Sequence, residues 1–76
     1  MKYEWDRGEI SAFAALANVR PSFLSDILQG RRTAGGKTAK RLAHASVLWH
    51  KRDKSFPETR VEQWLYPDEN DNPLLP

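Results

Sequence analysis

Hydrogen-bonding side chains and fixed positive charges lie close together along residues 20–37. The polar uncharged or acidic members are Ser22, Ser25, Asp26 and Gln29, and the flanking cations are Arg20, Arg31, Arg32 and Lys37. A serine hydroxyl donates and accepts, a glutamine amide can pair with adenine through two bonds, and a carboxylate accepts from the amino group of cytosine. Guanidinium and ammonium groups bind phosphate oxygens without reading sequence. This combination favours contact with a nucleic acid.

The surrounding apolar residues predict two short helices that would position these groups. The first helix, residues 9–17, is apolar at Phe13, Ala14 and Ala17, and the second, residues 21–29, is apolar at Leu24, Ile27 and Leu28. When the apolar edge of the second helix faces inward, its polar side chains face outward, because helical neighbours recur every three or four positions. The exposed set is then Ser22, Ser25, Asp26 and Gln29.

Three residues at the ends of these helices predict a tight turn between them. Asn18 tolerates the left-handed backbone that closes a helix. Pro21 suits the first helical position after an N-cap at Arg20, and Gly30 closes the second helix. Val19 and Leu24 then occupy the two positions of a hydrophobic staple, which fixes the angle at which the chain enters the second helix. An ordinary helical hairpin is the alternative interpretation.

Residues 9–46, EISAFAALANVRPSFLSDILQGRRTAGGKTAKRLAHAS, resemble the helix-turn-helix of the Cro and lambda-repressor (XRE-like) class of phage and bacterial regulators, especially its small prophage-type members. Phe13 and Ala14 stand where that pattern has Leu-Ala, and Asn18 replaces the usual turn glycine. The positions that match directly are Leu24, Ile27, Gly30 and Leu42. Only eight residues precede Glu9, so the full helix that usually comes before the pair is missing.

The resemblance implies an all-α, compact lambda-repressor-like domain of four to five helices, with its helix-turn-helix at about residues 9–29. It implies a transcriptional regulator that binds a double-stranded DNA operator as a homodimer and reads the major groove with helix 21–29. Base contacts are expected from Pro21, Ser22, Ser25, Asp26 and Gln29, and phosphate contacts from Arg20, Arg31, Arg32 and Lys37. Asp26 has an alternative role as the ion-pair partner of a neighbouring arginine. Lys40 and Arg41 could contact DNA or simply face solvent.

Further along the chain, a long helix is predicted over residues 37–51. The capping-box spacing of Ser55 and Glu58, with Pro57 inside the first turn, predicts another helix that contains Val61, Trp64 and Leu65. Residues 1–66 then form the DNA-binding domain. Residues 67–76 are polar and proline-containing, which predicts a flexible or loosely attached tail.

Charge is distributed unevenly along the 76 residues. Residues 20–54 carry nine Lys and Arg against two acids, for +7, whereas residues 55–76 carry one Arg against five acids, for −4. A basic block over the predicted reading helix is typical of nucleic-acid binders. The chain contains no cysteine, no membrane-length apolar run and no signal-peptide pattern, so we expect a cytoplasmic protein that is nucleoid-associated when bound to DNA. No catalytic residue, metal ligand or cofactor is predicted, and the chain is expected to be a non-enzyme.

Large apolar side chains in the second half of the chain leave a second function open. Trp49, Phe56, Trp64 and Leu65 could form a protein-binding face, and the chain would then be an antitoxin or a phage-encoded inhibitor built on the same scaffold. The small core must also be completed, either by Tyr3 and Trp5 or by the C-terminal Val61, Trp64 and Leu65.

Overall fold

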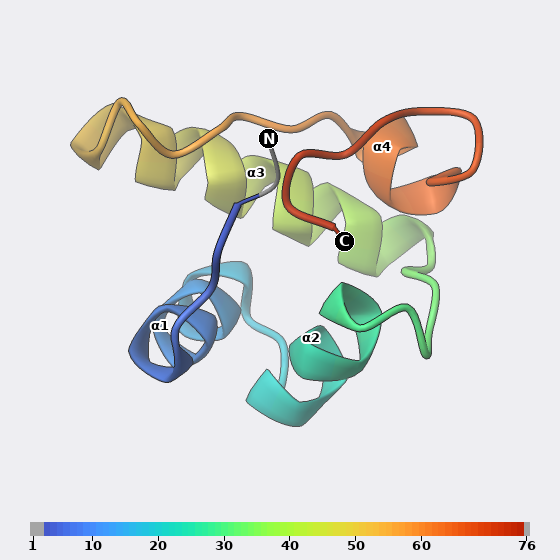
Figure 1. The fold of residues 1–76 in the computed structure, drawn as a ribbon, viewed down its shortest axis with the longest axis horizontal. Coiled ribbons are helices and arrows are strands. Elements are labelled where there is room, and N and C mark those ends of the chain that lie inside the picture. The colour runs from blue at the N-terminus through green and yellow to red at the C-terminus, as the bar shows by residue number, and fades with distance from the viewer. Residues whose placement is uncertain (1–2, 76) are drawn as a thin grey trace.

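Four helices make up the fold in a computed structural model that describes residues 3–75. They are α1 (Arg7–Ala17), α2 (Pro21–Leu28), α3 (Gly36–Arg52) and α4 (Val61–Leu65). The described residues contain no strand, so the expectation of an all-α fold is confirmed. Figure 1 shows α3 running along the molecule, with α1 and α2 on one side and the segment leading into α4 on the other. Within residues 3–75, no helix combines the length and the apolar character needed to cross a membrane.

Helix α1 begins two residues earlier than the predicted Glu9, because Asp6 caps it. The Asp6 carboxylate accepts from the Glu9 backbone N–H at 2.8 Å, and the Glu9 carboxylate accepts from the Asp6 backbone N–H at 3.2 Å. This reciprocal pair satisfies two backbone donors that the first turn of a helix leaves without partners. The capping box therefore extends α1 back to Arg7.

Left-handed residues close α1 and α2, as the sequence predicts. Asn18 has φ 58° and ψ 46°, and Gly30 has φ 79°. After α1, the backbone N–H of Val19 donates to Ala14 O at 2.9 Å. After α2, the N–H of Arg31 donates to Asp26 O at 2.8 Å and that of Gly30 donates to Ile27 O at 3.1 Å. Both ends are Schellman motifs, which turn the chain sharply and satisfy the last carbonyls of each helix.

The core collects side chains from every helix. The buried apolar residues are Phe13, Ala14, Ala17, Leu24, Ile27, Leu28, Ala34, Ala39, Leu42, Ala43, Ala45, Phe56, Trp64 and Leu74. Aromatic rings surround Phe56, whose centroid lies 4.9 Å from that of Tyr3, 5.8 Å from that of Trp5 and 5.1 Å from that of Trp49. Tyr3 and Trp5 therefore complete the core from the N-terminal side, while Trp64 completes it from the C-terminal side.

A buried hydrogen-bond network ties α3 to α4. The Ser46 hydroxyl donates to Ala43 O at 2.7 Å, so its single proton is used there. The Thr59 hydroxyl must then be the donor in its 2.7 Å bond to Ser46 Oγ, and Thr59 Oγ1 accepts from the Trp64 indole N–H at 2.8 Å. Every polar atom of the three side chains has a partner, which is the condition for burying such groups without a large cost.

The predicted capping box at Ser55 and Glu58 is wrong. The hydroxyl and backbone N–H of Ser55 both donate to Asp53 Oδ1, at 2.6 and 3.1 Å, and these bonds hold the pKa of Asp53 below its usual value. Residues 57–60 run without helix, and α4 begins only at Val61, where Gln63 Oε1 accepts from the Arg60 backbone N–H at 2.6 Å. Asp53, the residue that follows α3, thus accepts the hydrogen bonds of Ser55, the serine that the sequence predicts at a helix start. Helix α3 itself extends one residue beyond each predicted end.

The predicted loose attachment of residues 67–76 also differs from the structure. Asn72 and Leu74 are only 2% and 1% exposed. The Trp5 indole N–H donates to Leu74 O at 3.1 Å, and the Tyr3 backbone N–H donates to Pro73 O at 3.0 Å. The segment is polar on average, yet it places one leucine in the core and pairs with the N-terminal arm. Residues 3–75 therefore form one packed unit, while Pro76 lies outside the described residues.

Candidate nucleic-acid interface

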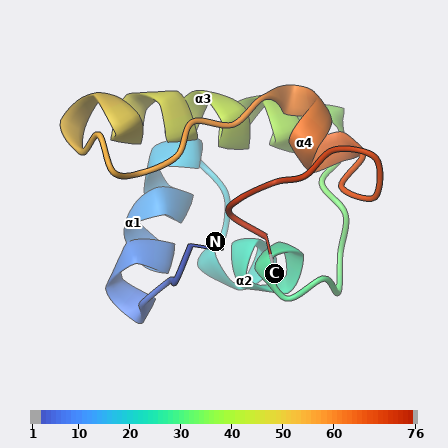
Figure 2. The same ribbon diagram turned by 45° about the horizontal axis from the view of Figure 1, so that its top comes forward.

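Helix α2 presents the predicted polar face to solvent. Its apolar edge, Leu24, Ile27 and Leu28, is buried, whereas Pro21, Ser22 and Gln29 are exposed and Ser25 and Asp26 are half-buried. Figure 1 shows α2 at the lower edge of the molecule, with α1 beside it and α3 above both. Figure 2 shows α2 turned away from the direction of α1 rather than folded back beside it. The arrangement differs from an antiparallel hairpin and leaves the outer face of α2 uncovered.

Two polar residues on this face are linked along the helix. The Gln29 side-chain amide donates to Ser25 Oγ at 3.1 Å. This bond uses one of the two amide hydrogens. The other hydrogen and the carbonyl oxygen make no bond within residues 3–75, so the two groups that pair with adenine remain for a ligand. Ser25 therefore orients Gln29 while the amide keeps its capacity for base recognition.

Asp26 pairs with both arginines that follow α2. Its Oδ1 lies 3.3 Å from Arg31 Nη1 and its Oδ2 lies 3.4 Å from Arg32 Nε. The Arg32 guanidinium also lies over the Phe23 ring, 5.7 Å from the centroid. These contacts favour the ion-pair role for Asp26 over free access to a cytosine. Exposed pairs of this kind contribute at most about 1 kcal/mol, so phosphate oxygens can compete for the arginines.

An open depression beside α2 gathers arginines from three separate segments. It has a volume of about 430 Å³ and lies between the α1–α2 turn, α2, the loop after α2 and the start of α3. Its charged and hydroxyl-bearing lining residues are Arg20, Ser22, Asp26, Arg32, Thr38 and Arg41. We call this feature the arginine depression. The fold thus brings together four of the predicted site residues, Arg20, Ser22, Asp26 and Arg32.

The remaining predicted residues lie outside the arginine depression. Pro21, Ser25, Gln29, Arg31 and Lys37 do not line it, although all except the half-buried Ser25 are exposed. Two lining residues, Thr38 and Arg41, were not among the predicted site residues. The sequence does not decide whether Arg41 contacts DNA or faces solvent, because its position depends on how α3 packs against α1 and near the turn that follows α1. Its spacing from Ala39 and Leu42, both buried, indicated only that it faces outward.

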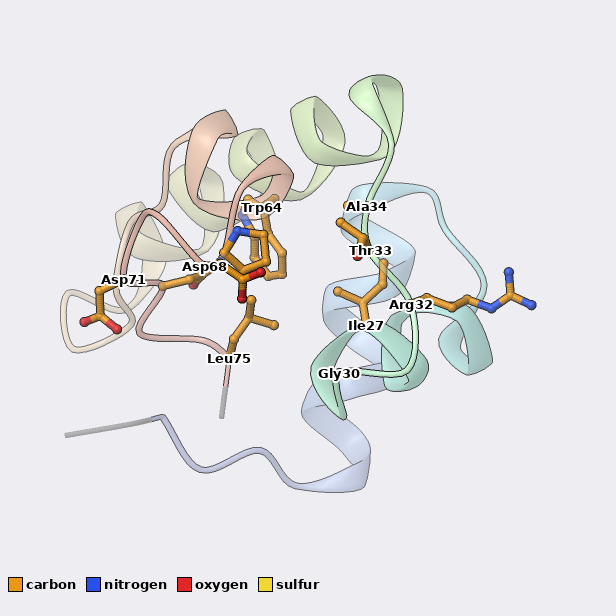
Figure 3. Close-up of a pocket in the computed structure, with 11 residues that line it drawn as sticks. Ile27, Gly30, Arg32, Thr33, Ala34, Trp64, Asp68, Asp71 and Leu75 are labelled. Atoms are coloured by element: carbon orange, nitrogen blue, oxygen red, sulfur yellow. The ribbon is translucent and has the colours of Figure 1, made fainter.

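A second pocket lies on the other side of the loop that follows α2. Figure 3 shows it between that loop and the C-terminal segment, with Ile27, Ala34, Trp64 and Leu75 among its lining residues. Asp68 and Asp71 also line it, whereas the Arg32 side chain carries its guanidinium away from it. Carboxylates repel phosphate, so this side of the loop suits a nucleic acid less well than the arginine depression does.

The four residues expected to form an alternative protein-binding face do not form one exposed surface. Phe56 is 0% and Trp64 is 1% exposed, because both rings fill the core between α3 and the C-terminal segments. Trp49 and Leu65 are half-buried and pack against the same core. These residues belong to the packed core of a small domain or lie against it. Among residues 3–75, Tyr66, at 54%, is the only large hydrophobic side chain that is exposed.

The comparisons with known proteins leave the chain without an assigned family. No family model matches it, and no curated protein or solved structure matches it significantly.

Proposed function

We propose that the chain is a sequence-specific, double-stranded DNA-binding transcriptional regulator that reads the major groove with α2. The observation that carries the proposal is the exposed polar face of α2, set by the left-handed turn at Asn18 and flanked by arginines. A short helix that projects its N-terminal residues past the rest of the domain is the geometry of a recognition helix. The likeness of residues 9–46 to Cro and lambda-repressor regulators points the same way.

The side chains divide into two roles under this proposal. Ser22 and Gln29, with Pro21 and Ser25 beside them, face base edges and supply specificity. Arg20, Arg31, Arg32 and Lys37 bind phosphates, which fixes the register of the protein on the duplex and makes affinity depend on salt. Asp26 holds two of these arginines.

The regulator acts as a homodimer on a palindromic operator in the cytoplasm. Two copies of α2 would enter successive major grooves on one side of the duplex, at half-sites roughly 34–36 Å apart. Arg20, Arg31 and Arg32 would then contact the backbone at each half-site. Selection of bound sequences from a random duplex pool is expected to enrich an inverted repeat.

The paired variant Arg31→Ala/Arg32→Ala separates phosphate binding from base reading. It should weaken binding to all duplexes alike and flatten the dependence of affinity on salt, because it removes phosphate contacts only. Lys51→Ala/Lys54→Ala is the matched control, since it removes the same charge at the far end of α3. A pool that enriches no sequence, together with unchanged binding by the arginine variant, would overturn the proposed function.

A further inference from the structure

Three arginines that are distant in sequence line the arginine depression. Arg20 precedes α2, Arg32 follows it, and Arg41 lies in α3. Within residues 3–75, neither Arg20 nor Arg41 takes part in an ion pair, and Asp26 is the one acidic residue that lines the depression. Gathering three cations around one carboxylate leaves an excess of positive charge, which favours an anion at this place.

The donor set indicates which anion fits. Three arginines from separate segments line the depression, and two hydroxyl-bearing residues, Ser22 and Thr38, line it as well and can supply further donors. A carboxylate presents two oxygens in one plane and needs only one guanidinium. A phosphate presents its oxygens tetrahedrally and can use donors that surround it.

We propose that the arginine depression binds a single phosphate group of the DNA backbone, with Arg20, Arg32 and Arg41 as its charged ligands and Asp26 as the residue that positions Arg32. This inference rests on the proposed function, because it names the part of the surface that holds the duplex. It adds Arg41 to the predicted phosphate ligands and separates Arg31 and Lys37, which lie outside the depression, from this particular phosphate.

Asp26 orients Arg32 without consuming its hydrogen-bonding capacity. The carboxylate pairs with Nε of Arg32, at 3.4 Å, and the Phe23 ring lies against the guanidinium. The two Nη groups make no bond within residues 3–75, so the edge that forms two parallel bonds to a phosphate stays open. The ion pair and the ring together reduce the freedom of a long side chain before the phosphate arrives, which lowers the entropic cost of binding.

The test compares Arg41→Ala with Arg52→Ala in duplex titrations over a salt series from roughly 50 to 200 mM. Both variants remove one arginine from α3, but Arg52 lies in its last turn and does not line the depression. Loss of one phosphate contact makes the negative slope of log K against log salt shallower by about 0.9, so the affinity ratio across this range should shrink by about 3.5-fold in R41A. The R52A slope should equal that of the unmodified chain.

The outcomes separate this inference from the proposed function. If the unmodified chain binds a selected duplex and R41A keeps the slope of R52A, the phosphate site is refuted while the regulator survives. If the unmodified chain binds no duplex, the proposed function fails first. Titration with inorganic phosphate alone, followed by amide chemical shifts of Thr38 and Arg41, tests the source of the anion. Tight, Arg41-dependent saturation by free phosphate without duplex binding would overturn the DNA assignment.

A double-mutant cycle tests the positioning role of Asp26. If Asp26 acts through Arg32, the effect of Arg32→Ala on duplex affinity should shrink in an Asp26→Asn background, and Asp26→Glu should restore part of it. If Asp26 only repels the duplex, the two effects should be additive, and Asp26→Asn should strengthen binding equally with and without Arg32. The second result would remove Asp26 from the site.

Discussion

The indole Nε1 of Trp64 donates to Thr59 Oγ1 at 2.8 Å in the interior, where the two side chains are 1% and 4% exposed. This bond joins the segment that leads into α4 to α4 itself, and the Ser46 hydroxyl extends the network to α3. The network holds α4 against α3 near the start of α4, where the predicted capping box of Ser55 and Glu58 does not form. Buried hydrogen bonds as well as apolar packing therefore hold α3 and α4 together.

Replacing Thr59 with valine should destabilise the fold by about 1–3 kcal/mol. The substitution keeps the shape of the side chain but leaves the buried Trp64 N–H without an acceptor and removes the donor to Ser46. Equilibrium denaturation in urea measures the change. Thr59→Ser keeps the hydroxyl and should recover most of the stability apart from the lost methyl group. Equal stability of T59V and the unmodified chain would show that the network contributes nothing.

Substitution of Gly30 by alanine should cost about 1 kcal/mol through backbone conformation alone. Gly30 has φ 79°, and no atom lies within 4 Å of an added Cβ, so the cost is that of a left-handed alanine and not of a clash. Gly36→Ala is the matched control, because Gly36 opens α3 with equally free space. That change should stabilise the chain by up to about 1 kcal/mol. Thermal unfolding that orders the two variants the other way would contradict the Schellman closure of α2.

The buried C-terminal leucine makes residues 67–75 part of the stable unit. Leu74→Ala should destabilise the fold by about 2–5 kcal/mol, a large share of the stability of so small a domain. Leu75→Ala is the comparison, because Leu75 is only half-buried and should cost less. Urea titrations of both variants decide the point. If L74A unfolds at the same denaturant concentration as the unmodified chain, the segment is not anchored as the packing indicates.

The contribution of Tyr3 to the stability of the fold should decrease at alkaline pH. Burial, reinforced by the hydrogen bond that its hydroxyl donates to Glu9, raises the pKa of Tyr3 above the ordinary phenol value. The folded state then holds the phenol proton more tightly than the unfolded state. The stabilisation is fully present below about pH 10 and is lost as the pH rises from there toward the folded pKa.

Tyr3→Phe removes the titrating phenol. Above about pH 10, the free energy of unfolding of this variant should fall less steeply with pH than that of the unmodified chain. Tyr66→Phe, at an exposed tyrosine, is the control and should leave the pH profile of the unmodified chain in place. The measurement is urea unfolding at a series of alkaline pH values. Parallel profiles for Y3F and the unmodified chain would rule out the partly buried hydrogen bond to Glu9.

Features decided by neighbouring residues could be predicted from the sequence. Asn18, Pro21 and Gly30 have backbone preferences that act locally, so the start and the closure of α2 followed from them, although α2 ends at Leu28, one residue before the predicted end. The spacing of the apolar residues gave its inner edge. Ser55 and Glu58 have an equally local signal, but Asp53 competes for the serine, and the predicted helix start was wrong. The sequence pattern shows a possible cap but does not show which hydrogen bonds the serine makes.

Burial at long range could not be predicted in the same way. Phe56 and Leu74 lie in polar stretches, and they become interior through contacts with residues far away in sequence, including Tyr3 and Trp5 of the N-terminal arm. The same limit applies to Arg41, which joins the candidate site because α3 packs near the turn before α2. The pairing of Asp26 with Arg31 and Arg32 was open to prediction because the partners are close in sequence.

Chemical-shift mapping of the backbone amides while a selected duplex is added tests the central claim most directly. If α2 reads DNA, the largest changes should fall on Ser22, Gln29, Arg32 and Arg41, and they should weaken as salt is raised. Changes concentrated instead on Ala12 and Ala15, on the outer face of α1, or no saturable change at low salt, would contradict a DNA-reading role for α2.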